Sequence, residues 1–249
     1  MDDIVALKNL LDFFILSGVD ENIQDVPVNH CEKTEVKTQV VIKSNNFAPV
    51  VNKNTVSSRS ERLLEGINDL ESLNKALMSQ EIDLKSYCMH TVCGRGVENP
   101  DVLVLGDMPN ADTDKSGIAF SGNSGQLLEK MLASIGLSDK TNTYLAYLFP
   151  YKTPGNRLPT FDELVVVLPY VKKLVKLLKP AVIISLNVYP ANTLTGASWS
   201  LAKNHGEFMD YQGAAVVAIY DPELLLIDAS KKALAWEDLK KISLFLNNK

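Results

Sequence analysis

Four short apolar runs, separated by segments with helical periodicity, constrain the fold of this 249-residue chain more than any other feature. The runs cover residues 102–105, 143–148, 181–186 and 215–220. Helical patterns cover residues 127–135, 160–178 and 230–246. Strands that alternate with helices form a parallel sheet with helices on both faces. The pattern predicts an α/β fold, a three-layer α/β/α sandwich with a short parallel four-stranded central sheet.

The first sixty residues differ in character from the rest. Residues 1–25 place apolar side chains at helical spacing, which predicts an N-terminal amphipathic helix. Residues 26–60 are polar and poor in large apolar side chains, so we expect a flexible linker. A second helical pattern begins at residue 61 and runs to about residue 80. We therefore expect the folded domain to cover residues 61–249.

Charge and composition exclude several classes of protein. The net charge is -5, and residues 1–100 carry 15 acidic and 10 basic side chains, whereas residues 101–249 carry 15 of each. This balance argues against a uniformly basic surface that coats nucleic acid. The acidic start Met1-Asp2-Asp3 and the lack of an 18-residue apolar run predict neither an export signal nor a transmembrane helix. The chain has three cysteines, too few for a disulfide framework. We therefore expect a cytoplasmic protein with reduced thiols.

Ligands of open parallel sheets bind beyond the carboxyl ends of the strands. The informative segments are therefore the loops that follow the four runs, at residues 106–125, 149–159, 187–191 and 221–226. The first loop has neither the Gly-Lys-Ser/Thr ending of a Walker A motif nor a G-x-G-x-x-G fingerprint. Small-molecule phosphate binding is therefore disfavoured.

The loop sequences resemble those of the family-four uracil-DNA glycosylases. Gly-Asp-Met-Pro-Asn at 106–110 is similar to the family's Gly-Glu-x-Pro-Gly, and Pro-Gly-Asn-Arg-Leu-Pro-Thr at 154–160 to its Pro-rich loop. Pro222 with the leucines at 224–226 resembles a His-Pro-x-x-Leu-Leu motif, and Trp-Glu-Asp-Leu at 236–239 a closing helix motif. The resemblance implies a uracil-DNA glycosylase-like fold and hydrolysis of the N-glycosidic bond of a deaminated base flipped out of DNA.

The resemblance also implies a set of site residues. Phe120 matches the aromatic ring on which the flipped base stacks. The alternative is that Phe120 is an ordinary loop aromatic packed into the core. Asp107 stands where the family has a glutamate, so it is a candidate for water activation. The catalytic candidates are Asp107 and Asp221; the substrate-binding candidates are Gly106, Met108, Asn110, Phe120 and Tyr147.

Three of these positions depart from the family pattern. Asn110 replaces a glycine, and asparagine tolerates a left-handed backbone best among the other residues. Tyr147 replaces the asparagine whose amide reads the base edge. Asp221 replaces the histidine that stabilises the negative charge on the leaving base. We therefore expect weak or altered activity; the alternative is a catalytically inactive member that binds DNA or a repair partner.

Weak contact with DNA, single- or double-stranded, is expected from a few residues. The candidates are Lys152, Asn156, Arg157, Glu223 and Leu224. Leucines 224–226 fit either a wedge in the minor groove or buried positions at a helix start. A repair protein is a possible further partner, and we expect a monomer that does not bind membranes.

The family often carries an iron–sulfur cluster held by four cysteines. The resemblance places ligand positions at Ile82, Tyr151 and Val167, among others, and Cys88 and Cys93 do not fall on them. The sequence therefore predicts no cluster, no other metal and no cofactor.

Overall fold

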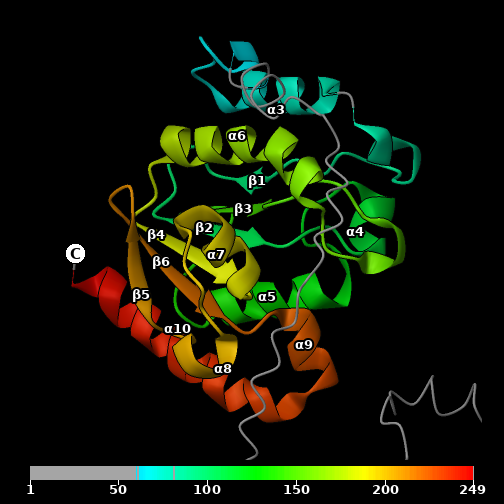
Figure 1. Ribbon diagram of the computed structural model, residues 1–249. Coiled ribbons are helices and arrows are strands. Elements are labelled where there is room, and N and C mark those ends of the chain that lie inside the picture. Colours follow the sequence, from blue (N-terminus) through cyan, green and yellow to red (C-terminus); the bar gives the residue numbers. More distant parts are fainter. Residues whose placement is uncertain (1–59, 61, 81, 249) are drawn as a thin grey trace, which may run out of the picture. The chain divides into compact units, whose positions relative to one another are not determined.

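Four parallel strands form the centre of the sheet, as the apolar runs predict. They are β2 (Val102–Gly106), β3 (Thr143–Tyr147), β4 (Val182–Leu186) and β6 (Ala214–Ile219). Every residue of β2, β3 and β4 is buried, because helices cover both faces. This computed structural model describes residues 60, 62–80 and 82–248, all within one compact unit (Figure 1). The amphipathic helix and the linker predicted over residues 1–25 and 26–60 therefore lie outside the described residues, apart from residue 60.

Two antiparallel edge strands extend the sheet beyond the four strands that the sequence predicts. The strand β1 (Arg95–Gly96) pairs with β3, and β5 (Phe208–Tyr211) pairs with β6. The order is β1-β3-β2-β4-β6-β5, so the sheet is six-stranded and mixed. Both edge strands are partly exposed and neither contains a continuous apolar run. The predicted parallel four-stranded sheet is therefore confirmed as the centre of the sheet, and the two edge strands are additions that the apolar runs do not indicate.

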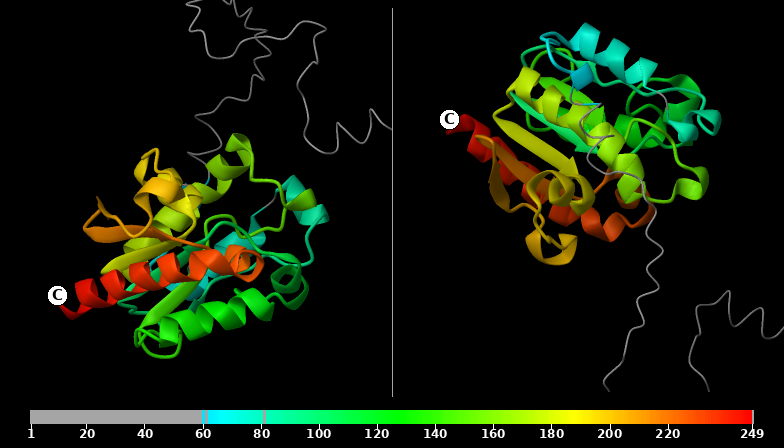
Figure 2. Two further views of the ribbon diagram at one scale, coloured as in Figure 1. Left: turned by 90° about the horizontal axis from the view of Figure 1, so that it is seen from below. Right: turned by 45° about the horizontal axis from the view of Figure 1, so that its top comes forward.

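Helices cover both faces of the sheet and complete the three predicted layers. On one face, α6 (Phe161–Leu178) and α7 (Val188–Thr195) share an apolar core with the sheet, and α3 (Leu70–Ser79) packs on α6. On the other face lie α5 (Gly122–Ala133) and α10 (Lys232–Asn247), which Figure 2 shows side by side. None of the described helices is long and apolar enough to span a membrane.

Short elements occupy the connections. They are the helices α4 (Ala111–Ser116), α8 (Leu201–Asn204) and α9 (Pro222–Ile227), and the 3-10 turns η1 (Asp83–Ser86), η2 (Pro154–Asn156) and η3 (Ala229–Lys231). The helices α4 and α9 both begin at the carboxyl-end edge of the sheet, so their first residues face the crevice where ligands bind in this architecture.

Local chemistry explains where the helices begin. Thr160 and Glu163 form a reciprocal capping box at the start of α6. The helical pattern over residues 61–80 does not form one helix, because the chain turns at Gly66 with φ of 84° and α3 begins only after Asp69, which caps it. Helix α5 begins at Gly122, directly after Ser121 and five residues before the helical pattern that the sequence shows over 127–135.

A buried carboxylate links the C-terminal helix α10 to the segment after α8. Asp238, in the Trp-Glu-Asp-Leu segment, is fully buried on α10 and lies 2.8 Å from the ring nitrogen Nδ1 of His205, just after α8. Burial raises the pKa of Asp238, while the hydrogen bond to His205 opposes that shift. This part of the resemblance therefore concerns packing rather than the pocket.

Candidate active site

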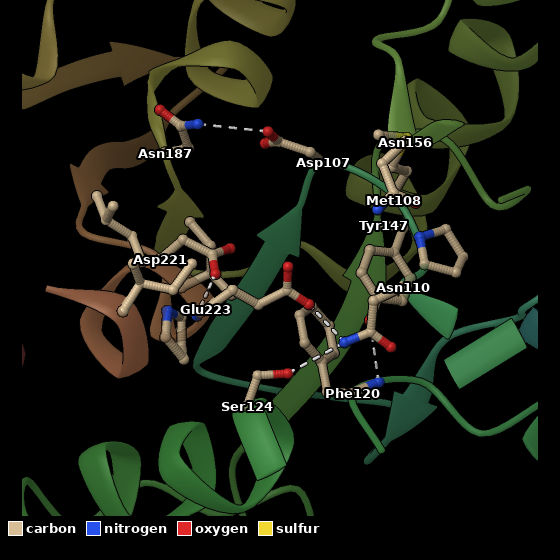
Figure 3. Close-up of a pocket in the computed structure, with 15 residues that line it drawn as sticks. Asp107, Met108, Asn110, Phe120, Ser124, Tyr147, Asn156, Asn187, Asp221 and Glu223 are labelled. Carbon is tan, nitrogen blue, oxygen red and sulfur yellow. Dashed lines mark hydrogen bonds between the residues drawn. The ribbon is translucent and has the colours of Figure 1, made fainter. Parts of the chain in front are cut away.

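A pocket of about 320 Å³ lies beyond the carboxyl ends of the parallel strands. Four loops converge on it, one after each of β2, β3, β4 and β6, because parallel strands place these ends at one edge of the sheet. Its lining residues, drawn as sticks in Figure 3, are Asp107, Met108, Pro109, Asn110, Phe120, Ser124, Tyr147, Asn156, Leu186, Asn187, Asp221, Pro222, Glu223, Leu224 and Ile227.

Two stacked aromatic rings form one wall of the pocket. The ring centroids of Phe120 and Tyr147 lie 4.3 Å apart with an interplanar angle of 20°. The Tyr147 hydroxyl accepts a hydrogen bond from the Phe120 amide nitrogen at 3.1 Å and lies 3.4 Å from Oγ1 of Thr113. The side chain of Tyr147 thus covers one face of Phe120, and it holds the Phe120 backbone at a φ of 53°.

A glycine at the end of β2 makes room for this pair of rings. A Cβ atom at Gly106 would lie 2.8 Å from Cζ of Phe120 and 3.0 Å from Cδ1 of Tyr147. The strand end at Gly106 must therefore lack a side chain for both rings to fit, whereas the substrate-binding role of Gly106 stays a prediction.

Asp107 is a half-buried acid of the pocket. Its Oδ2 atom accepts a hydrogen bond from Nδ2 of Asn187 at 3.4 Å, and its buried Oδ1 atom has no hydrogen-bond partner among the described residues. Burial raises the pKa of Asp107 to about 7, and the negative charges of Asp221 and Glu223 add to the shift. Asp107 therefore exchanges a proton near neutral pH.

Asp221 lies on the opposite side of the pocket, at the start of α9. Its carboxylate caps this helix by accepting a hydrogen bond from the Glu223 amide nitrogen at 2.6 Å. Burial raises the pKa of Asp221 to about 6; the capping bond lowers it, and the charge of Glu223 raises it further. Two carboxyl groups of the pocket thus titrate close to physiological pH.

Asn110 and Glu223 join opposite sides of the pocket. Nδ2 of Asn110 donates to Oε1 of Glu223 and, at 3.2 Å, to Oγ of Ser124 (Figure 3). Its Oδ1 atom caps α4 by accepting from the Thr113 amide nitrogen at 2.9 Å. With a φ of -84°, Asn110 is extended. The expectation that asparagine serves here for a left-handed backbone was therefore wrong, and capping explains the residue.

The DNA-contact candidates divide into two groups. Asn156, Glu223 and Leu224 line the pocket, whereas Lys152 and Arg157 do not. Arg157 is paired with Glu163 through two hydrogen bonds of 2.6 and 2.8 Å. Its positive charge is therefore already compensated at the start of α6.

The leucines of α9 divide between the two predicted roles, buried positions at a helix start and exposed positions able to contact a groove. Leu225 is buried against Tyr220 and Ala235, as a helix-start leucine should be. Leu224 and Leu226 remain exposed by 38% and 50% of their surface. Part of this segment is therefore core, and part is available at the pocket rim.

Two polar residues of the pocket, Asn187 and Ser124, were not among the sequence candidates. Asn187 adopts a φ of 88° directly after β4 and donates to Asp107. Ser124 accepts from Asn110 within the first turn of α5. The signal for Asn187 was its place, because a polar residue directly after a buried parallel strand faces the ligand crevice. Ser124 had no comparable signal.

The positions where the resemblance places cluster ligands do not fit an iron–sulfur cluster. Tyr151 and Val167 are buried in the apolar core and Ile82 packs against it, so none of the three offers a thiolate. Burial raises the pKa of Cys88 and that of Cys93, the latter to about 11, which keeps both thiols protonated. The described part of the chain contains no group of three His, Cys, Asp or Glu side chains able to hold a metal ion.

Comparison with known proteins agrees with the architecture of the pocket. Residues 93–240 match the family model of the uracil DNA glycosylase superfamily. The chain is 28% identical to the Type-4 uracil-DNA glycosylases of Pyrobaculum aerophilum and Archaeoglobus fulgidus, over 71% of this chain and 93% and 92% of theirs. It is 23% identical to that of Sulfurisphaera tokodaii, over 71% of this chain and 84% of the relative. The chain therefore belongs to the uracil DNA glycosylase superfamily.

Proposed function

We propose that this protein is a DNA-repair glycosylase that hydrolyses the N-glycosidic bond of a damaged base and excises uracil only weakly. The observation that carries the proposal is Asp107, a half-buried acid whose buried Oδ1 atom has no partner among the described residues, in a pocket beside stacked aromatic rings. Membership of the superfamily, and the similarity to Type-4 uracil-DNA glycosylases, support DNA as the substrate.

In this proposal, Asp107 acts as the general base. Its free Oδ1 atom would accept a proton from the water that attacks C1′ of the sugar as the bond to the base breaks. A pKa of about 7 leaves roughly half of the carboxyl groups ionised at neutral pH. Asn187 is a positioning residue, since its amide orients the other oxygen of Asp107.

Two features make uracil a poor substrate. The ring of Tyr147 covers a face of Phe120 on which a flipped base would stack. Uracil also leaves as an anion, and Asp221 and Glu223 would place carboxylates near that developing charge. Loss of one anion-stabilising donor costs about 10²–10³ in rate, and a like charge in its place should cost more.

A non-catalytic module that binds DNA or a repair protein is the second candidate. The stacking of Tyr147 on Phe120 and the link from Asn110 to Glu223 favour it, because both reduce the room for a flipped base. The two candidates differ in whether any damaged base is released in a manner that depends on Asp107.

A strand-cleavage assay distinguishes them. Single- and double-stranded oligonucleotides carrying uracil, hypoxanthine or xanthine are incubated with protein, and abasic sites are then cut with alkali. We expect slow release from at least one substrate, abolished in Asp107→Asn and retained in the control Asp210→Asn, which alters an exposed residue of β5 outside the pocket. A folded wild-type protein that releases no base would establish the non-catalytic candidate.

DNA binding should be weak and strongly dependent on salt. With Z phosphate contacts, the logarithm of duplex affinity falls with a slope of about -0.9Z against the logarithm of salt concentration. Lys152→Ala should flatten that slope by about one unit. Arg157→Ala should flatten it less, because Glu163 already pairs with the guanidinium. Fluorescence anisotropy across a salt series measures both, and an unchanged slope in Lys152→Ala would place the DNA elsewhere.

We also expect the purified protein to contain no iron. Apolar side chains occupy the positions implied for ligands, and both described thiols are held protonated by burial. Iron analysis and the absorbance near 400 nm after anaerobic purification measure this; an absorbance band with stoichiometric iron would contradict the prediction.

A further inference from the structure

We propose that the pocket prefers a base that is already a cation before cleavage, an N-alkylated nucleobase, over uracil. This inference rests on the proposed glycosylase function and names its substrate class. It follows from the polar lining of the pocket, from the charge balance of the reaction and from the aromatic wall.

The polar lining is rich in hydrogen-bond acceptors and poor in side-chain donors. Three carboxyl groups line the pocket, those of Asp107, Asp221 and Glu223. Of the three side-chain amides that line the pocket, that of Asn187 donates to Asp107 and that of Asn110 to Glu223, which leaves the amide of Asn156. Uracil would present two carbonyl oxygens and one N–H donor to this lining, so two of its three polar edge groups would meet carboxylates acceptor against acceptor. An N-alkylated base brings a positive charge and, in adenine or guanine, exocyclic amino donors as well.

The charge balance of the reaction favours the same class. In an N-alkylated purine the ring is positively charged, and when the bond from C1′ to the base breaks, its electron pair neutralises that charge. The base leaves as a neutral molecule, water adds to C1′, and the proton of that water passes to the Asp107 carboxylate. No donor is required for a leaving anion, so Asp221 and Glu223 no longer oppose the reaction.

The aromatic wall adds an attraction that favours cations. Phe120 and Tyr147 both line the pocket, and the faces of aromatic rings attract positive charge. Burial and the charge of Glu223 raise the pKa of Asp107 to about 7 and that of Asp221 to about 6 in the free protein, and the charge of Asp221 adds to the shift of Asp107. A bound cation would offset that repulsion, so binding should release protons between these two pKa values.

The test compares alkylated with uracil-containing DNA. Oligonucleotides methylated with dimethyl sulfate, and matched uracil oligonucleotides, are incubated with the protein, and released bases are quantified by mass spectrometry after subtraction of spontaneous loss. We expect methylated bases to be released at least about 10-fold faster than uracil. Asp221→Asn and Glu223→Gln should each lower that preference about 10-fold, because each removes a negative charge. Asp210→Asn, outside the pocket, should leave it unchanged.

The outcomes separate this inference from the proposed function. Release of uracil as fast as methylated bases would overturn the inference and leave the glycosylase function intact. Release of no base from any substrate would overturn the proposed function itself. Should Asp221→Asn fail to fold because its helix cap is weakened, Glu223→Gln still decides, since glutamine keeps an oxygen acceptor for Asn110. An unchanged preference in folded Glu223→Gln would contradict the role of the carboxylates.

Discussion

The double substitution Tyr147→Asn and Asp221→His should raise the rate of uracil excision at least about 100-fold over the wild-type rate. Asparagine removes the ring that covers Phe120 and supplies an amide able to pair with the base edge. Histidine replaces a carboxylate of the pocket with a donor for the leaving anion. Phe120 and Asp107 are left in place, so the changes act on base binding and on the leaving group.

Single-turnover assays on a uracil-containing oligonucleotide measure this gain. Tyr147→Phe is the matched control, because it removes the hydroxyl that bonds to the Phe120 amide but keeps the ring. We expect no gain from that control. A double variant that folds and binds DNA yet stays inert would show that the ring and the carboxylate are not what limits uracil excision.

Asp107→Asn should stabilise the protein at pH 8 by up to about 4 kcal/mol in the free energy of unfolding. The pKa of Asp107 is raised from 3.8 to about 7 in the folded state, so the folded protein binds more protons than the unfolded chain between these values. The contribution of Asp107 to stability is therefore greatest below pH 4 and falls as the pH rises through 7. The asparagine amide carries no charge, which removes this loss.

Urea unfolding at pH 4 and at pH 8 tests the prediction. The wild type should lose stability between the two values, and Asp107→Asn should lose less. Part of the dependence will remain, because Asp221 also has a raised pKa, of about 6. Asp210→Asn should behave like the wild type. Equal losses in Asp107→Asn and the wild type would contradict the assignment of a buried, titrating acid.

Much of the fold could be predicted, because buried parallel strands are continuous apolar runs and the helix of 160–178 carries its own capping box. The edge strands could not be predicted because neither is a continuous apolar run. The strand β1 has two residues, and β5 alternates between exposed and half-buried positions. Gly66 shows a further limit, since a single left-handed residue ended a pattern that periodicity alone would continue.

The site was harder to predict than the fold. The place of Asp107 and Asp221 followed from their positions after strands, and both lie in the pocket. The contact between Phe120 and Tyr147 depends on how two loops fold over the strand end at Gly106, which no local pattern encodes. The ion pair between Arg157 and Glu163 could not be predicted for the same reason. The two side chains meet only because the chain turns into α6 between them.

The central claim is that Tyr147 covers a stacking face of Phe120, and that Asp221 and Glu223 oppose the charge of a departing uracil. The most direct test is the single-turnover rate of the wild-type protein on a single-stranded uracil oligonucleotide, measured beside a Type-4 relative under the same conditions. We predict a rate at least about 100-fold below that of the relative. A rate within about tenfold of the relative would contradict the claim.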